Sequence, residues 1–342
     1  MANSRRIAAL DPLGTWCRQR PAVGVPAAEL ASLVAASQLE LPLPGSGDTW
    51  TRFRALADLG SRDLSLARLA EGHLDALAIV AEAGYRLVPS HARLGVWAAG
   101  PRPTLTARRI SGGWRLHGLR RWCSGAPSLT HALVMAEVAS QGQLFLVDVQ
   151  APGVSVIADS WPAVGMAGSE TFDVSFEEVD LEDHAGVGPL DFYLSRPGFW
   201  HGAVGVSAVW WGGARAAAAP LLCAKEGATA HRLAHAGAVR ARLWSMEGAL
   251  RTAALRIDDD PMDSTGEARA LAGVVRHLVE SGATEVLDRV GRGTGAEPLG
   301  HDGAHARRVA DLTVYLRQSH AEADLAALEG FFLAGGTLKA FA

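Results

Sequence analysis

The amino-acid sequence predicts a multidomain α+β protein in which a helical region, an antiparallel β module and a second helical region follow one another. Before about residue 90 and after about residue 190, apolar residues recur at helical spacing. Between these regions they alternate with polar residues along short segments bounded by Gly and Pro. We therefore expect an N-terminal helical domain (1–90), a middle β-domain (91–187) and a C-terminal helical domain (188–342).

Composition narrows the class of protein. Of the 342 residues, 49% are hydrophobic and 20% charged, which is typical of a globular core. The net charge of -4 gives no electrostatic reason to expect a nucleic acid or anionic membrane as partner. The 3 cysteines are far apart without metal-ligand spacing, which predicts a reducing compartment and no metal site. We see neither a secretory signal nor a membrane-spanning run, and expect a cytoplasmic protein.

The first region predicts helices over 27–36 and 64–83, separated by Pro and Gly. In the second segment, one helical face carries Leu66, Leu69, His73, Ala76 and either Ile79 or Val80. That face is the expected contact with the rest of the molecule.

The middle region predicts strands. The segments "ALVMAEV" and "QLFLVDV" flank a hairpin turn at 139–142. In "TFDVSFEEV", the residues Phe172, Val174 and Phe176 share one face, and the other face is polar. One apolar and one polar face indicate an antiparallel sheet, arranged as a small barrel or sandwich.

The last region predicts long helices. A continuous apolar stripe runs over 239–257 and ends at an Asp-Asp-Asp-Pro stop, 258–261. Further apolar patterns cover 271–290 and 309–316. Long helices with antiparallel returns favour a four-helix bundle. The stripe residues are Val239, Leu243, Met246, Leu250, Ala253 and Ile257.

The stretch "WRLHGLRRWCSGAPSLTHALVMA" resembles the middle domain of the acyl-CoA dehydrogenases, which reads Gly-x-Lys-x-Trp-Ile-Thr/Ser-Asn-Gly before a strand. The resemblance continues through "LFLVDVQAPGVSV" and "VGMAGSETFDVSFEEVDL" and spans about 70 residues in order. It implies N-terminal helices, a central antiparallel β-barrel and a C-terminal four-helix bundle. It also implies FAD, bound between the β-domain and the bundle.

The resemblance implies which residues would contact the flavin ring. Trp122 would lie against the ring, and Ser124 would hydrogen-bond near N5. Cys123 would contact the isoalloxazine through its backbone. A broad aromatic face and a short hydroxyl suit a flat ligand with ring nitrogens. The alternative is a core tryptophan and a turn serine.

A second glycine-rich segment, "VGRGTGAEPLG", resembles the place where the family's backbone approaches the pyrophosphate or ADP part of FAD. Gly291, Gly293 and Gly295 would permit such an approach. Arg232 and His235 stand where the family uses an Arg and a Gln from the partner subunit. The alternatives are an ordinary interhelical loop and solvated side chains.

The sequence departs from the family at two functional segments. Where the family reads Thr-Glu-Pro-Gly-x-Gly-Ser-Asp, this chain has "GVWAAGPRPTL", with Trp97 at the flavin-bonding Thr and only Gly100 retained. The position of the family's catalytic Glu is Ser319 in "RRVADLTVYLRQSHAEADL", with His320 and Glu322 close by. His201, among aromatic residues on an earlier helix, is a further candidate base.

The resemblance implies an FAD-dependent oxidoreductase that dehydrogenates an acyl thioester at Cα–Cβ, with hydride transfer to the flavin. Its substrate would be a small molecule such as an acyl-CoA, and the chain would form a homodimer or homotetramer. Because the expected Glu is replaced, a flavin-dependent monooxygenase on the same fold is an alternative, with a histidine of the last helices serving the oxygen chemistry. A paralogue that binds a flavin or a partner without turnover is the third hypothesis.

Overall fold

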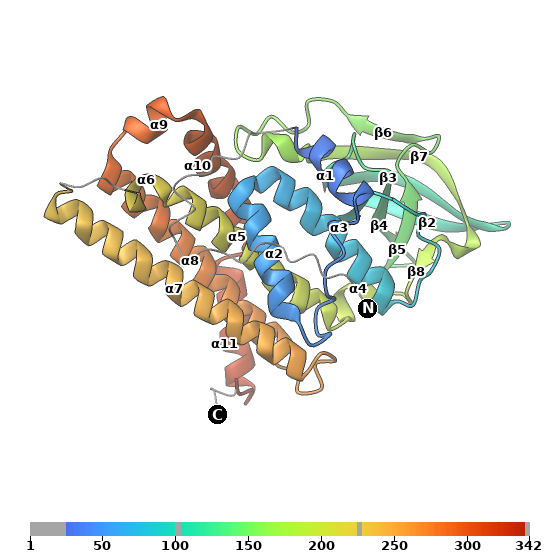
Figure 1. The fold of residues 1–342 in the computed structure, drawn as a ribbon. Coiled ribbons are helices and arrows are strands. Elements are labelled where there is room, and N and C mark those ends of the chain that lie inside the picture. Colours follow the sequence, from blue (N-terminus) through green and yellow to red (C-terminus); the bar gives the residue numbers. More distant parts are fainter. Residues whose placement is uncertain (1–24, 100–103, 224–227, 339–342) are drawn as a thin grey trace, which may run out of the picture.

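The computed structural model describes residues 25–99, 104–223 and 228–338, so Cys17 and Gly100 lie outside the described residues. Helices form one side of the molecule and a β-sheet the other, with α3 between them (Figure 1). The helices are α1 (Pro26–Ala35), α2 (Thr49–Arg62), α3 (Leu64–Glu82), α4 (Phe192–Ser195), α5 (Gly198–Ala217), α6 (Ala219–Leu222), α7 (Ala230–Asp259), α8 (Ala268–Thr294), α9 (Glu297–His301), α10 (Gly303–Tyr315) and α11 (Glu322–Leu333).

The sheet is mixed and open, which corrects the expected antiparallel barrel. Its strands pair in the order β6-β7-β3-β2-β4-β5-β8, and β1 pairs in parallel with β4. In the described residues, no pairing joins the outer strands β6 and β8, which span only 4 and 2 residues. The strands are β1 (Leu94–Trp97), β2 (Thr104–Ile110), β3 (Gly113–Cys123), β4 (His131–Val138), β5 (Gln141–Asp148), β6 (Val154–Ile157), β7 (Phe172–Glu182) and β8 (Gly186–Val187).

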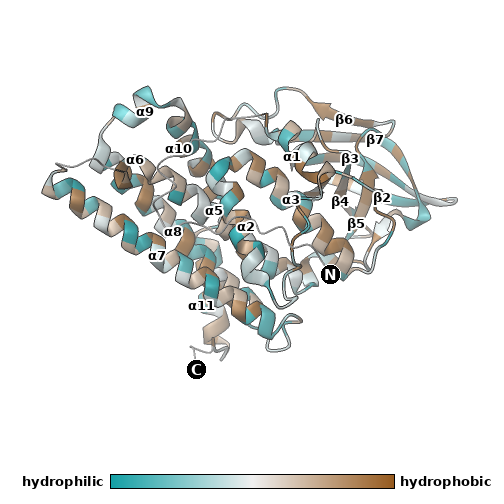
Figure 2. Ribbon diagram, viewed as in Figure 1, coloured by the Kyte–Doolittle hydropathy of each residue, from teal (hydrophilic) through white to brown (hydrophobic). Residues whose placement is uncertain are grey.

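The predicted hairpin and apolar faces are confirmed. Strands β4 and β5 pair antiparallel around a turn at Ala139 and Ser140, both in the left-handed region with φ 48° and 71°. Val174 and Phe176 are fully buried. Of the six stripe residues of α7, five are at most 2% exposed, and Leu243 is 7% exposed. Hydrophobic residues are concentrated in the strands next to α3 (Figure 2).

Helix α5 lies at the centre of the helical side and packs against α2, α3, α7 and α8. A Cβ on Gly212 of α5 would overlap the Ala57 carbonyl of α2, and a Cβ on Gly60 would overlap the Val209 carbonyl, so the two backbones nearly touch. The expected bundle of 188–342 alone is therefore not confirmed. Its helices pack together with α2 from the N-terminal region.

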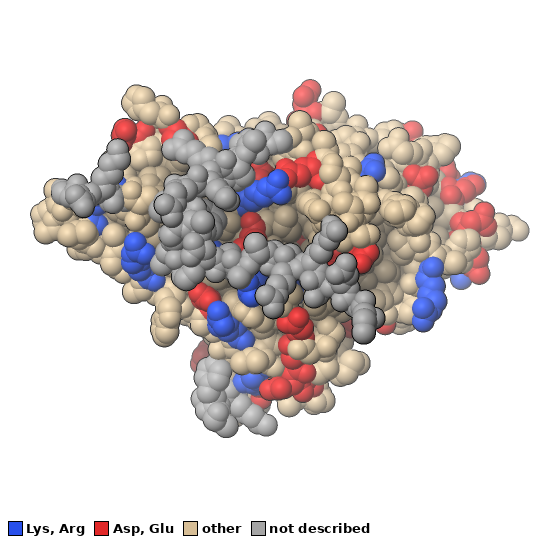
Figure 3. Space-filling model, in the orientation of Figure 1, with Lys and Arg blue, Asp and Glu red and all other residues tan. Residues whose placement is uncertain are grey.

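Surface charge is mixed. On the face shown in Figure 3, acidic and basic residues are interspersed. Among the described residues, no helix combines the length and apolar character needed to cross a bilayer.

His73 connects α3 to the first strand. Its imidazole Nδ1 accepts a hydrogen bond of 3.2 Å from the Leu94 N–H, and the side chain is buried. Burial lowers the pKa of His73 from 6.5 to about 4. As the pH falls below 6.5, His73 becomes protonated in the unfolded chain, whereas in the folded chain it stays neutral until about pH 4.

We therefore expect His73 to cost up to about 3 kcal/mol of stability between pH 6.5 and pH 4. His73→Asn keeps an acceptor for the Leu94 N–H but does not titrate, so its urea unfolding free energy should fall less over this range. Equal slopes of unfolding free energy against pH for the two proteins would contradict the assignment.

Candidate functional site

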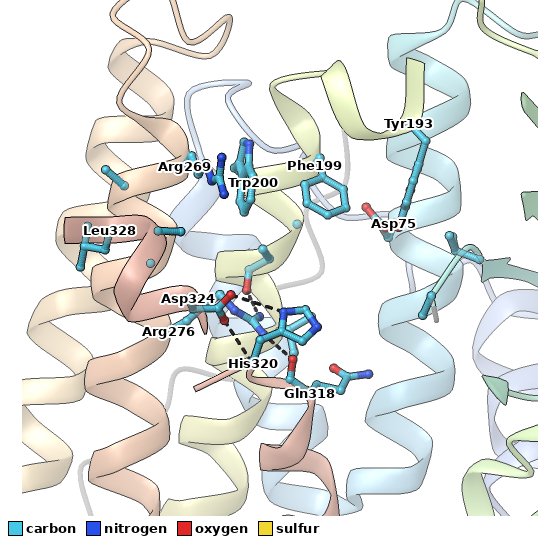
Figure 4. A pocket seen from close by; sticks show the side chains of 18 of the residues that line it. Asp75, Tyr193, Phe199, Trp200, Arg269, Arg276, Gln318, His320, Asp324 and Leu328 are labelled. Atoms are coloured by element: carbon cyan, nitrogen blue, oxygen red, sulfur yellow. Dashed lines mark hydrogen bonds and ion pairs between the residues drawn. The ribbon is translucent and has the colours of Figure 1, made fainter. Parts of the chain in front are cut away.

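A cavity of about 750 Å³ opens between α3, α5, α8 and the segment that joins α10 to α11 (Figure 4). Its volume is in the range of small-molecule sites. Aromatic rings and glycines form much of its wall, and charged groups are placed around it. The polar side chains that line it are Arg68, Glu71, Asp75, Tyr193, Arg269, Arg276, Gln318, His320 and Asp324.

His320 reaches the cavity because the last two long helices are interrupted. The turn Leu316–Gln318 ends α10, Ser319 is extended, and Ala321 has φ 46° before α11 begins. Asp324, in the first turn of α11, accepts the His320 N–H at 3.1 Å, and its other oxygen lies 3.3 Å from His320 Nδ1. With Nδ1 held by the carboxylate, Nε2 is the ring nitrogen left for a ligand.

Helix α3 contributes both acidic and basic side chains to the cavity wall. Arg68 and Glu71 form an ion pair one turn apart, and both side chains are largely buried. Asp75 and Glu82 are held by the buried Arg196, at 3.3 and 2.9 Å. Burial raises the pKa of the Glu71 carboxyl, and the Arg68 guanidinium opposes that shift.

Helix α8 contributes Arg276, which fixes the lower part of the cavity in Figure 4. Its guanidinium donates to the Ala203 carbonyl at 2.9 Å and to the Gln318 carbonyl at 3.1 Å. It also lies 4.7 Å from the Trp210 ring centroid. These bonds tie α5, α8 and the His320 segment together.

Of the candidate bases, only His320 lines the cavity in the part of the chain that the structure describes. Glu322 is exposed on the first turn of α11, where a carboxylate favours the helix N-terminus. Ser319 accepts the Ala321 N–H at 3.2 Å. His201 is buried on α5, and burial lowers its pKa. It does not line the cavity, although its neighbours Trp200 and Gly202 do.

The Trp122–Ser124 segment lies at the end of β3. Trp122 has φ 59° and is 49% exposed, and its N–H donates to Asp173 at 3.2 Å. Cys123 is fully buried. Ser124 is 3.0 Å from the Thr171 hydroxyl and lines a much smaller pocket. That pocket shares Arg68, Gly72 and Val96 with the cavity, so Ser124 lies just behind the cavity wall.

Trp97 fills space beside Ser124. Its side chain is 1% exposed, and its indole N–H donates to the Ser124 carbonyl at 3.1 Å. The residue at the family's flavin-bonding Thr is therefore a buried support for the Trp122–Ser124 segment.

The second expected cofactor segment forms a separate cluster. Gly291 and Gly293 lie within α8, and Gly295 ends that helix with φ 69°, so the first two are not in a loop. Arg232 donates to the Gly293 carbonyl at 3.4 Å and the Pro220 carbonyl at 2.7 Å, and His235 packs on Gly293. This end of α7 and α8 lies on the opposite side of the molecule from the sheet (Figure 1).

Sequence reasoning missed most of the cavity. The signal was present in α3, where Arg68, Glu71 and Asp75 interrupt an otherwise apolar helix at spacings of three and four residues. No comparable signal marks Arg276 or Asp324, because their roles depend on contacts between helices.

Comparison with known proteins places the β-sheet region in a family. A model described as "Acyl-CoA dehydrogenase, middle domain" matches residues 94–179. The amino sugar nitrososynthase RubN8 of Streptomyces rubradiris is 37% identical over 73 residues, which is 20% of this chain and 17% of that protein. The alignment thus spans about a sixth of that relative's length.

Solved structures share the whole fold. FMN-bound TdsC from Paenibacillus sp. A11-2 superposes with a TM-score of 0.80 at 20% identity, covering 95% of this chain and 94% of that one. The methanesulfinate monooxygenase MsuC from Pseudomonas fluorescens gives 0.76 at 17% identity, covering 96% and 98%. KijD3, in complex with FMN and a dTDP-linked amino sugar, gives 0.77 at 20% identity, covering 92% and 88%.

At these identities the solved structures show the fold, and the matched middle domain lies within it. The sheet contains the segments that resemble the family. At the cavity, His320 stands next to Ser319, the position at which the resemblance places the catalytic Glu. Residues 94–179 therefore match the middle domain of the acyl-CoA dehydrogenases, and the chain shares its fold with TdsC, MsuC and KijD3.

Proposed function

We propose that this protein is a flavin-dependent monooxygenase that uses reduced FMN to oxygenate a small molecule in the cavity. The observation that carries the proposal is His320, held by Asp324, at the wall of a cavity that adjoins Ser124 of the middle domain. TdsC is named as a dibenzothiophene monooxygenase and MsuC as a methanesulfinate monooxygenase, and TdsC and KijD3 were solved with FMN.

Two residues at the end of β3 support a flat flavin ring there. Trp122 is half-exposed, and Ser124, whose hydroxyl lies 3.0 Å from that of Thr171, lines the small pocket together with Arg68. Trp97 departs from the family's hydroxyl and supports Ser124 through its carbonyl. We propose FMN in place of the expected FAD, because the expected ADP contacts around Gly293 lie at the far end of the helices in this chain.

When bound, reduced FMN supplies two electrons to O2, so that one oxygen atom enters the substrate and the other leaves as water. The chain's own task is to orient the substrate, exclude water and handle a proton. His320 Nε2 is free to take up or return that proton, while Asp324 holds Nδ1.

Within the described part of the chain, each carboxylate of the cavity is engaged and none is free to remove an α-proton from an acyl thioester. Among its described carboxylates, Glu71 pairs with Arg68, Asp75 with Arg196 and Asp324 with His320. This favours oxygenation over the acyl-CoA dehydrogenation that the resemblance first implies.

Flavin binding tests the proposal through Trp122 and Ser124. We expect Trp122→Ala and Ser124→Ala each to weaken FMN binding about tenfold, through lost ring contact and a lost hydrogen bond. Titration of flavin fluorescence with FMN and FAD measures both affinities. The matched control is Trp244→Ala, which removes an indole of the same size that is 78% exposed on α7 and should leave the flavin affinity unchanged. Unchanged affinity in both site variants would overturn the assignment, and a chain that binds no flavin would favour the paralogue without turnover.

We also propose that the chain self-associates and that it is divided into three domains. The outer face of α7 carries Leu233, Trp244 and Leu255 at eleven-residue intervals, all at least 60% exposed. Such an apolar stripe supports a homodimer or homotetramer. The domain boundaries at about residues 90 and 187 fall at the two changes between helices and sheet.

A further inference from the structure

We infer that the cavity selects an anionic aromatic substrate, whose acid group binds Arg269 and whose rings lie along Phe199 and Trp200. The inference rests on the proposed function and adds the substrate class. It comes from three independent features of the cavity: an arginine without a partner, an aromatic wall and unfilled space.

The first feature is an arginine without a partner. Glu71 pairs with Arg68, Asp75 pairs with Arg196, and Asp324 lies beside His320. Arg276 is held by two carbonyls. Arg269 alone among the described cavity arginines has neither an ion pair nor a carbonyl partner, and its guanidinium lies 5.4 Å from the Trp200 ring centroid. Arg269 is exposed at the cavity beside the indole, so its fork of N–H donors is open to a carboxylate, sulfonate or phosphate.

The aromatic wall is continuous. Tyr193 and Phe199 meet edge to face at 5.3 Å, and Phe199 and Trp200 meet at 4.9 Å in the same manner. Because the three rings support one another, their exposed edges and faces form a rigid surface that suits a planar apolar ligand.

Glycines leave room for that ligand. Gly273 of α8 and Gly330 of α11 both line the cavity within helices, where glycine costs about 1 kcal/mol relative to alanine. Packing does not require either one, because a Cβ on Gly330 would meet nothing within 4 Å and one on Gly273 would meet Leu328 at 3.8 Å. The glycines instead keep the cavity wide between its two polar ends.

The polar ends are arranged for a ligand of fixed length. Arg269 and Trp200 lie at one end of the cavity, and His320 and Gln318 lie at the other (Figure 4). Along α8, Arg269 precedes Arg276 of the His320 end by seven residues, about 10 Å of helix. A fused two-ring acid bound at Arg269 would therefore extend its far ring towards His320.

The test compares two probes of the same shape, 2-naphthoate and neutral 2-naphthamide, by calorimetry on the full chain with saturating FMN. We expect the wild type to bind the naphthoate about tenfold more tightly, as for one hydrogen-bonded charge. Arg269→Gln should remove this difference and leave the naphthamide affinity unchanged. Arg251→Gln, an equal loss of charge on the exposed face of α7, should preserve it. Equal binding of the two probes by the wild type would overturn the inference.

A second arm separates the substrate from the cofactor as the source of the anion. If Arg269→Gln weakens FMN but not riboflavin, and leaves naphthoate binding unchanged, Arg269 binds the flavin phosphate and the substrate assignment is wrong. Repeating the naphthoate titration without flavin separates this inference from the proposed function. Charge-selective binding in a chain that retains no FMN would sustain the former while the latter failed.

Discussion

Replacing His320 with alanine should lower reduced-flavin-dependent oxygenation by about 10²–10⁴-fold, the usual contribution of a positioned acid or base. FMN affinity and thermal stability should stay close to wild type, because the side chain is exposed to the cavity and holds only Asp324. The measurement is product formation from aromatic carboxylates in the presence of a flavin reductase, quantified by mass spectrometry.

Three variants give this prediction its control. His320→Gln retains hydrogen bonding but cannot carry the proton, so it should be nearly as impaired as alanine. Asp324→Asn keeps the imidazole but weakens its hydrogen bond at Nδ1, so its oxygenation rate should lie between those of the wild type and His320→Ala. Glu322→Ala, two residues from His320 but outside the cavity, should be unaffected. A loss of activity in Glu322→Ala with none in His320→Ala would reverse the assignment.

Replacing Glu71 with alanine should destabilise the protein by about 3–5 kcal/mol, the cost of leaving a buried charge without its partner. Arg68 would then lie in the cavity wall without its paired carboxylate. Urea unfolding followed by circular dichroism measures the loss as a lower midpoint with an unchanged slope.

The double variant Arg68→Met, Glu71→Leu is the control for this second prediction. Because both charges are removed and their volume is kept, it should recover most of the stability that Glu71→Ala loses. A double variant no more stable than Glu71→Ala would show that the ion pair is not the source of the effect.

Much of the fold could be predicted because it depends on local patterns. The buried stripe of α7 has a 3–4 spacing, and α7 ends at Asp259, within the predicted stop at 258–261. The alternation in 171–179 predicts the burial of Val174 and Phe176. The Trp122–Ser124 segment was identified because an extended motif surrounds it, and residues 94–179 match the family model.

The rest depends on contacts between distant residues. Helix α2 begins without a side-chain cap from its own Asp48, and Asp258 at the end of α7 accepts the Thr49 N–H at 3.0 Å and the Thr49 hydroxyl at 2.6 Å. No local signal announces such a start. The sheet is open because its outer strands, β6 and β8, do not pair with each other in the described residues. The cavity is lined by residues of α3, α5 and α8, which are far apart in the sequence.

The central claim is oxygen transfer by reduced FMN, and isotope labelling tests it most directly. The protein is supplied with FMN, a flavin reductase, NADH and ¹⁸O2 together with aromatic carboxylates such as 2-naphthoate. The account predicts a product that contains one ¹⁸O atom, formed by the wild type and lost in His320→Ala. Two results together would contradict it: no ¹⁸O in any product, and bleaching of the bound flavin by an acyl-CoA in a separate experiment without oxygen. They would favour acyl-CoA dehydrogenation instead.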